Sequence, residues 1–270
     1  MAARRRDLAN ATAVVTGGGG GIGGAMAAAF AGAGMNVVLA DIDGEAAERA
    51  AAALASEERR VLATTTDVSR SEDLEALAEL AYAQFGEVNV LCNNAGVMTF
   101  EPVHRLRESD WRWVLSVNLF GVIHGVQAFL PRMKEQQGWG HIVNTASILG
   151  LKAQPRLAPY AASKYAVVAI SESLRAERED HGLGISVLCP GMVATQIVRS
   201  ERNRQAEFGE ATTADTAWLH EAVSQGLDPE RVAELVREAV ETDAFWIQTD
   251  PSARVESEQR LAEILESFDR

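Results

Sequence analysis

The chain has 270 residues, 47% of them apolar, which is enough for one large domain with a substantial core. Its net charge is −13 and it has no basic stripe, which argues against a nucleic-acid partner. No apolar stretch approaches the roughly 20 residues of a membrane span, and Asp7 and Asn10 interrupt what would be a signal peptide, so we expect a cytoplasmic protein without a membrane partner.

The N-terminal run Arg4, Arg5 and Arg6 is expected to be a solvated tail. Cys92 and Cys189 lie in apolar runs that are typical of buried strands, so we expect them to be reduced core thiols. Neither has the spacing of a metal ligand, and no metal site is predicted.

Short apolar runs alternate with longer helical patterns along the chain, and the runs are continuous, as in strands that are covered on both faces. We therefore predict an α/β protein with a single-domain doubly wound Rossmann fold, a parallel sheet of about seven strands and helices on both faces. The predicted strands are 11–16, 35–40, 61–66, 88–92, 141–145, 185–189 and 245–247. The predicted helices are 22–33, 45–56, 72–85, 111–134, 160–180 and 230–242.

One polar stretch, residues 199–228, has no clear period and separates a core of residues 10–198 from a C-terminal helix, strand and tail at 229–270. It contains Phe208 and Trp218, which a solvated linker would not need. We expect it to be a substrate lid, and a mobile surface loop is the alternative.

The segment from Thr16 to Gly24 follows the first predicted strand and is rich in glycine. Backbone N–H groups at a helix N-terminus bind phosphate, and only glycine lets a pyrophosphate approach them closely. The G-x-G-x-x-G pattern fits from Gly18 and from Gly19, so it leaves the role of each glycine open. A flexible turn is the alternative, but the order of strand, turn and helix predicts a dinucleotide site.

Asp41 ends the second predicted strand, where an acidic side chain accepts hydrogen bonds from the adenosine ribose and repels a 2′-phosphate. This favours NAD over NADP. Asp43 competes for the role, and Asp41 as an ordinary loop carboxylate is a further alternative. Asp67 closes the third strand and could meet the adenine amino group, although a turn or capping aspartate is nearly as good an explanation.

Tyr160 and Lys164 are four residues apart, so on a helix they leave the same face, where the cation favours the phenolate and lowers the tyrosine pKa. Ser147 follows a strand, at the sheet edge where ligands bind, so its hydroxyl and that of Tyr160 can reach one substrate oxygen. Asn118 lies among apolar residues of a predicted helix, and because asparagine is a poor helix former, we expect a specific hydrogen bond to explain its presence there. Taken singly, Ser147 could be a turn residue, Asn118 a buried group bound to backbone and Lys164 a solvated lysine.

Together these residues resemble a classical short-chain dehydrogenase/reductase over about residues 10–200. The family's T-G-x-x-x-G-x-G motif matches Thr16, Gly17, Gly21 and Gly23, and its Asp-Val pair matches Asp67 and Val68. Its N-N-A-G motif matches Asn93 to Gly96, and its P-G-x-x-x-T motif matches Pro190, Gly191 and Thr195. The first of these motifs decides which glycines of the loop have the cofactor-binding roles, namely Gly17, Gly21 and Gly23, which the G-x-G-x-x-G pattern left open. The family's catalytic residues fall on Asn118, Ser147, Tyr160 and Lys164.

The resemblance implies hydride transfer with bound NAD, with Tyr160 as general acid/base, Lys164 lowering its pKa and Ser147 binding the substrate oxygen. It also implies that Asn118 holds a water, and that Thr195 and the Val193 backbone bind the nicotinamide carboxamide. The expected cofactor-binding residues are Gly17, Gly20, Gly21, Ile22, Gly23, Asp41, Ile42, Asp67, Val68, Asn94, Ala95, Gly96, Tyr160, Lys164, Pro190, Gly191, Val193 and Thr195.

The expected substrate walls are mostly apolar, which favours a hydrophobic secondary alcohol or its ketone. An NADPH-dependent carbonyl reductase and a non-catalytic NAD-binding sensor or scaffold are the alternatives. The resemblance also implies a homodimer or homotetramer, and the apolar segment 166–170 fits a helix buried against a neighbouring subunit. The expected substrate-binding residues are Val97, Met98, Ser147, Leu149, Leu157, Met192, Ile197 and Trp218.

Overall fold

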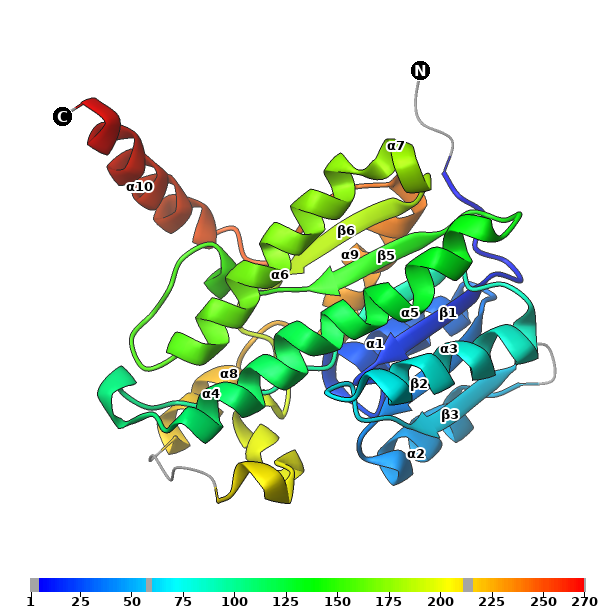
Figure 1. The fold of residues 1–270 in the computed structure, drawn as a ribbon, viewed down its shortest axis with the longest axis horizontal. Helices are drawn as coiled ribbons and strands as arrows, with labels where there is room; N and C mark the ends of the chain where they lie inside the picture. The colour runs from blue at the N-terminus through cyan, green and yellow to red at the C-terminus, as the bar shows by residue number, and fades with distance from the viewer. Residues whose placement is uncertain (1–4, 57–59, 211–215, 270) are drawn as a thin grey trace.

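One parallel sheet forms the centre of the computed structural model, which describes residues 5–56, 60–210 and 216–269. Its strands run in the order β3-β2-β1-β4-β5-β6-β7 (Figure 1). The order reverses between β1 and β4, and a doubly wound sheet has its ligand-binding crevice at the carboxyl ends of the strands there. The predicted fold class is confirmed. The strands are β1 (Thr12–Thr16), β2 (Asn36–Asp41), β3 (Val61–Thr65), β4 (Val90–Asn93), β5 (His141–Thr145), β6 (Gly184–Cys189) and β7 (Trp246–Gln248).

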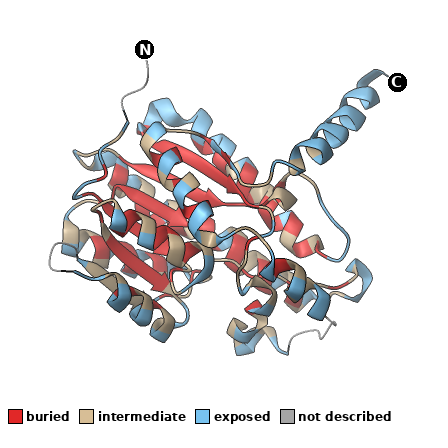
Figure 2. Cartoon of the chain, turned by 180° about the vertical axis from the view of Figure 1, so that it is seen from behind, coloured by how far each residue is buried: buried red, intermediate tan, exposed pale blue. Residues whose placement is uncertain are grey.

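Helices cover both faces of the sheet, so the strands are buried between two layers (Figures 1 and 2). This explains why the strand sequences are continuously apolar. The helices that share a core cluster on one face are α1 (Gly21–Gly32), α2 (Gly44–Leu54) and α9 (Pro229–Thr242). Those on the opposite face are α3 (Ser71–Phe85), α4 (Glu108–Leu115), α5 (Gly121–Glu135) and α6 (Ala158–Ala176).

The helix predicted over 111–134 is interrupted by the π-helical turn η2 (Ser116–Phe120), which joins α4 to α5. Such a turn inserts an extra residue into a helix and is frequent at functional sites. Within the described ranges, Glu108–Glu135 is the one helical stretch whose length and composition could cross a membrane, which corrects the expectation that no stretch approaches a span. Half of its most apolar part is buried inside the protein, so we interpret it as a core helix.

The segment after β6 is more ordered than the sequence predicted. It contains η4 (Ile197–Asn203), η5 (Ala206–Phe208) and α8 (Ala217–Ser224), while residues 211–215 lie outside the described residues. The helix predicted over 160–180 is also divided, because α6 ends at Ala176 and α7 (Arg178–His181) follows.

The predicted C-terminal tail contains a further helix, α10 (Ala253–Glu266). It extends away from the body of the molecule (Figures 1 and 2), and none of its residues is buried. Leu261 and Leu265 are exposed along it. Six of its 14 residues are charged, and the sequence pattern predicted no helix there.

The N-terminal arginines are not simply a solvated tail. Arg4 lies outside the described residues, but the Arg6 side chain is only 18% exposed. It donates hydrogen bonds to the Val240 carbonyl oxygen at 2.8 Å and to Asp243 Oδ1 at 2.9 Å. These contacts attach the N-terminal segment to the end of α9.

Candidate active site

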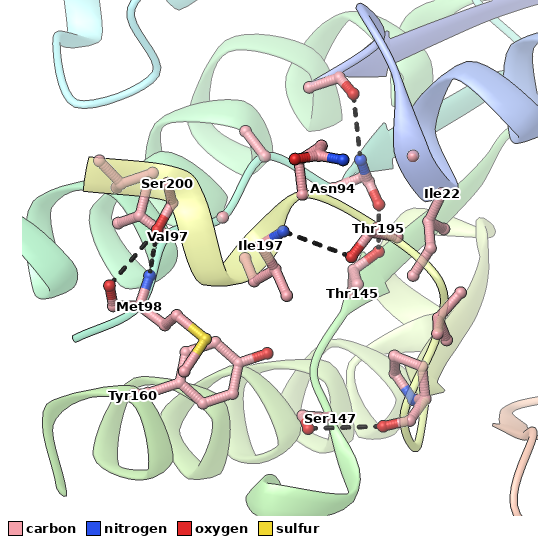
Figure 3. A pocket seen from close by; sticks show the side chains of 18 of the residues that line it. Ile22, Asn94, Val97, Met98, Thr145, Ser147, Tyr160, Thr195, Ile197 and Ser200 are labelled. Atoms are coloured by element: carbon pink, nitrogen blue, oxygen red, sulfur yellow. Dashed lines mark hydrogen bonds between the residues drawn. The ribbon is translucent and has the colours of Figure 1, made fainter. Parts of the chain in front are cut away.

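A cavity of about 630 Å³ lies at the carboxyl edge of the sheet, a size that is typical of small-molecule sites (Figure 3). Most of the predicted site residues line it, whereas Gly23, Asn118 and Trp218 do not. The lining residues that were predicted are Gly17, Gly20, Gly21, Ile22, Asp41, Ile42, Asp67, Val68, Asn94, Ala95, Gly96, Val97, Met98, Ser147, Leu149, Leu157, Tyr160, Lys164, Pro190, Gly191, Met192, Val193, Thr195 and Ile197.

The glycine loop between β1 and α1 leaves space for a phosphate group. Gly17 and Gly21 have φ angles of 66° and 54°, which glycine adopts readily and residues with a Cβ atom rarely adopt. A Cβ on Gly23 would lie 2.1 Å from the Gly17 carbonyl oxygen, so this glycine lets α1 pack on the loop. A Cβ on Gly20 would meet nothing within 4 Å, so the start of α1 faces open space. The N–H groups of a helix start attract anions, and the loop therefore fits a pyrophosphate.

Asp41 lies at the end of β2, directly beside this loop. Its Oδ2 accepts a hydrogen bond from the Gly19 N–H at 2.9 Å, and its Oδ1 accepts one from the Asp43 N–H at 3.0 Å. Asp43 instead caps α2, because its side chain accepts a hydrogen bond from the Ala46 N–H. Both carboxylates line the cavity, but it is Asp41 that is hydrogen-bonded to the glycine loop.

Asp67 is held in a turn after β3. Its Oδ1 accepts hydrogen bonds from the N–H and the hydroxyl of Ser69, at 3.0 and 2.7 Å, so the turn explanation describes part of its role. Its Oδ2 accepts a hydrogen bond from Gln205 Nε2 at 2.9 Å. Val68 and Ile42 add apolar surface to the same end of the cavity.

Asn94 joins the ends of three strands. Its N–H donates to Thr16 Oγ1 at 2.9 Å and its Nδ2 to the Thr16 carbonyl oxygen at 3.0 Å, while Thr145 Oγ1 donates to its Oδ1 at 3.3 Å. The following Gly96 brings the backbone close to Lys164, since a Cβ at this glycine would lie 3.6 Å from Lys164 Nζ. The end of β4 is thus fixed between the glycine loop and β5.

Asn118 lies in the π-helical turn and is fully buried. Its Oδ1 accepts a hydrogen bond from the Val97 N–H at 2.8 Å, and its Nδ2 donates to the Val97 carbonyl oxygen at 2.9 Å and to Ser163 Oγ at 3.1 Å. The hydrogen-bonding reason expected for this asparagine is therefore the loop after β4 and helix α6. A water held by Asn118 stays a prediction.

Tyr160 and Lys164 lie one turn apart at the start of α6, next to the end of β5. Lys164 Nζ donates to the Thr145 carbonyl oxygen at 2.8 Å and lies 5.5 Å from the centre of the Tyr160 ring. Ser147 Oγ accepts a hydrogen bond from the Leu149 N–H at 3.1 Å. The Tyr160 hydroxyl points into the space between Ile197 and Ser147 (Figure 3).

Burial dominates the ionisation of this pair. It raises the pKa of Tyr160 to about 12, against a hydrogen bond with Ser147 that lowers it. It also lowers the pKa of Lys164 to about 8. The lowered tyrosine pKa expected from the neighbouring lysine is therefore not found here, because desolvation of the phenolate raises the pKa and, among the described residues, the only group that lowers it is Ser147.

The turn after β6 forms the wall between the glycine loop and the apolar part of the cavity. The Gly191 N–H donates to Thr249 Oγ1 at 3.1 Å, and Val193 forms a parallel bridge with Leu227. Thr195 Oγ1 accepts a hydrogen bond from the Ile197 N–H at 3.4 Å (Figure 3).

Trp218 corrects the predicted substrate site. Its side chain is 56% exposed and packs edge-on against Phe100, with ring centres 5.6 Å apart. From the same helix, Leu219 and Val223 line the cavity instead. These two residues are four apart and share a helix face that Trp218 does not. The sequence showed no helix here, so it offered no way to tell which face is inside.

Several polar residues at the cavity were not predicted. Gln154, Gln205 and Glu256 line it, and Glu256 Oε2 lies 3.6 Å from Lys152 Nζ. They come from the loop before α6, from the segment after β6 and from α10, none of which has a motif or a clear period. No sequence signal would have located them.

Comparisons with known proteins agree with this geometry. The model of the short chain dehydrogenase family matches residues 11–206. The chain is 33% identical over 267 residues to the C alpha-dehydrogenase of Sphingobium sp. (strain NBRC 103272 / SYK-6), covering 97% of this chain and 88% of that protein. It is 36% identical over 245 residues to the 1-deoxy-11-beta-hydroxypentalenate dehydrogenase of Streptomyces exfoliatus, covering 90% and 84%.

A solved structure is similar over nearly the whole fold. It is a short chain dehydrogenase/reductase from Burkholderia phymatum in complex with NAD, with a TM-score of 0.93 and 37% identity, and the match covers 97% of this chain and 96% of that chain. The family match, the identities and the shared fold lead to one conclusion: the chain belongs to the short-chain dehydrogenase/reductase family of NAD(P)-binding oxidoreductases.

Proposed function

We propose that this protein is an NAD(H)-dependent oxidoreductase that interconverts a hydrophobic secondary alcohol and its ketone, with Tyr160 as the general acid/base. The main support is the position of the Tyr160 hydroxyl, which points into the cavity beside Ser147 (Figure 3). The relatives named as dehydrogenases and the neighbour solved with NAD add to it.

When bound, NAD supplies the hydride acceptor, the C4 atom of its nicotinamide. The glycine loop would hold the pyrophosphate, Asp41 the adenosine ribose, and Thr195 with the Val193 backbone the carboxamide. The described parts of the predicted lid, residues 199–210 and 216–228, would close over the substrate.

Tyr160 takes the alcohol proton during oxidation and returns it during reduction. Ser147 binds the substrate oxygen on which charge develops. Lys164 is held by the Thr145 carbonyl oxygen with its amine 5.5 Å from the centre of the Tyr160 ring, where it would hold the nicotinamide ribose. Asn118 positions this group by fixing the backbone at Val97 and the side chain of Ser163.

The proposed preference for NAD depends on Asp41. Its carboxylate lies at the glycine loop, where it would bind ribose hydroxyls and repel a 2′-phosphate. An NADPH-dependent carbonyl reductase is the alternative within the same family. Comparing kcat/KM for NADH and NADPH separates the two, and a preference for NADPH would refute the role given to Asp41.

The proposed substrate class depends on the apolar side chains around Tyr160. Met98, Leu149, Leu157 and Val223 line the cavity, which favours an aromatic or alicyclic alcohol over a charged one. We also propose a cytoplasmic enzyme that self-associates as a homodimer or homotetramer. The support for self-association lies on α6, where Ala169 of the apolar segment 166–170 is exposed.

A panel of aliphatic, alicyclic and aryl secondary alcohols, incubated with NAD and followed by nicotinamide absorbance, tests the proposal. We expect turnover with alicyclic or aryl members. NAD binding without turnover across the panel would instead support a sensor or scaffold.

A further inference from the structure

Gln205 brings the segment after β6 to the far end of the cavity. It lies between η4 and η5 and lines the same cavity as the glycine loop. Its Nε2 donates a hydrogen bond to Asp67 Oδ2 at 2.9 Å. Because Ser69 already binds Asp67 Oδ1 with two hydrogen bonds, the orientation of this carboxylate is fixed.

The amide oxygen of Gln205 is an acceptor in need of a donor. Its Oε1 atom is buried and has no hydrogen-bond partner within the described part of the chain. An unpaired buried acceptor is costly, and most such atoms in proteins are paired. Oε1 is closed off from the cavity in this conformation. A primary amine placed here would therefore donate one N–H to Asp67 Oδ2 and, once the Gln205 amide rotates toward it, the other to Gln205 Oε1.

The neighbouring Arg204 fixes this part of the segment on α4. Its Nη2 lies 2.8 Å from Asp110 Oδ1, and both side chains are almost fully buried, with 3% and 0% exposed. Its guanidinium also stacks 4.9 Å from the centre of the Trp113 ring. Because breaking a buried ion pair is strongly destabilising, the backbone at Gln205 is held in place by α4.

We propose that Gln205 is a further cofactor-binding residue, which binds the adenine amino group together with Asp67. The segment after β6 then reaches both ends of the dinucleotide, with Thr195 at the nicotinamide and Gln205 at the adenine. This inference rests on the proposed dinucleotide function and adds an adenine-reading residue to it.

The test compares the binding of NADH with that of reduced nicotinamide hypoxanthine dinucleotide, in which a carbonyl oxygen replaces the adenine amino group. Wild-type protein is expected to prefer NADH by at least about tenfold, because the amine donates to a charged carboxylate. The near-isosteric Gln205→Met variant is expected to bind NADH about fivefold more weakly and to bind the hypoxanthine analogue unchanged. Nicotinamide fluorescence gives both dissociation constants.

Gln225→Met in the same segment, at a residue outside the cavity lining, is the matched control and should keep the wild-type preference. Thermal melting checks that Gln205→Met folds. An unchanged preference for NADH in Gln205→Met, or an equal loss of both ligands, would overturn the adenine contact while leaving the proposed function intact. If wild-type protein binds neither dinucleotide, the proposed function itself fails.

Discussion

The two ends of β5 both hold buried titratable groups, but the cavity lies at the carboxyl end. There, Lys164 and Tyr160 line the cavity wall. At the amino end, the fully buried His141 accepts a hydrogen bond from Arg6 Nη1 through Nδ1 at 2.7 Å, and its Nε2 lies 2.7 Å from Ser186 Oγ.

The amino end has the residue types of a catalytic triad, yet its arrangement is structural. Ser186 Oγ donates to the Ala244 carbonyl oxygen at 2.6 Å, so its proton is already used. Burial, followed by the Arg6 charge, lowers the pKa of His141 to about 3, and the ring is neutral. The neutral ring connects β5, β6 and the N-terminal segment.

Burial therefore favours the neutral form at both ends of the strand. It raises the pKa of Tyr160 to about 12 and lowers those of Lys164 and His141 to about 8 and about 3. A shifted pKa alone does not identify an active site. Access to a ligand distinguishes the carboxyl end, so we expect changes there to affect turnover and changes at the amino end to affect stability.

The largest effect is expected for Tyr160→Phe, which removes the proposed acid/base. We expect kcat for alcohol oxidation to fall by about 10²–10⁴-fold, the usual contribution of a positioned proton-transfer group, while NADH still binds. Tyr165→Phe on the same helix is the control, because that ring contacts Arg260 outside the cavity. Steady-state kinetics and a fluorescence titration measure both quantities, and retained turnover in Tyr160→Phe would end the assignment.

Asp41→Ala should change the cofactor preference. Hydrogen bonds to a charged group contribute about 1.5–3 kcal/mol, so the ratio of kcat/KM for NADH over NADPH should fall by about 10–100-fold. Kinetics with both reduced cofactors give this ratio. If this ratio fell in Asp43→Ala and stayed unchanged in Asp41→Ala, the role would pass to Asp43, the residue that caps α2.

Arg6→Met tests the amino end. It removes charged hydrogen bonds to Asp243 and to the Val240 carbonyl oxygen, so the free energy of unfolding should fall by about 1.5–3 kcal/mol with kcat unchanged. The exposed ion pairs of Arg5 should contribute less than about 1 kcal/mol, which makes Arg5→Met the control. Urea unfolding compares the variants, and equal stability of the two would contradict the structural role of Arg6.

The smallest expected effect is a loss of stability in mild acid. Because the folded pKa of His141 is about 3, lower than the unfolded value near 6.5, the unfolded chain binds the proton first and stability falls as pH decreases. Between pH 6.5 and 5.5 this amounts to about 1 kcal/mol of unfolding free energy. Arg6, Asp243 and Arg178 are the charged groups around the ring.

His141→Asn should remove this part of the pH dependence. Urea unfolding of both proteins at the two pH values measures it. A wild-type slope that persists in the variant would assign the acid sensitivity to other groups.

The two ends of β5 also differ in how far the sequence predicted them. Glycine spacing and the Tyr160–Lys164 interval predicted the carboxyl end, because phosphate binding and proton transfer need particular residues at short distances along the chain. The prediction that Arg6 belongs to a solvated tail was wrong, because its hydrogen-bond partners lie more than 130 residues away in the sequence.

The substrate end was predicted only in part, for a similar reason. Leu219 and Val223 face the cavity on a helix of eight residues, too short to leave a period in the sequence. Gln205 gained a role only through its contact with Asp67, 138 residues earlier. The prediction of a lowered pKa for Tyr160 was wrong, because the spacing of residues in the sequence indicates a neighbouring charge but not how deeply the side chain is buried.

The most direct test of hydride transfer at the carboxyl end of β5 uses a secondary alcohol deuterated at its carbinol carbon. Wild-type protein is incubated with NAD and this alcohol, and the reduced nicotinamide is analysed by mass spectrometry and NMR. We predict deuterium at C4 of the nicotinamide with wild-type protein and at least about 100-fold less in the same time with Tyr160→Phe. NAD that stays bound but unreduced across the alcohol panel would contradict the proposed function.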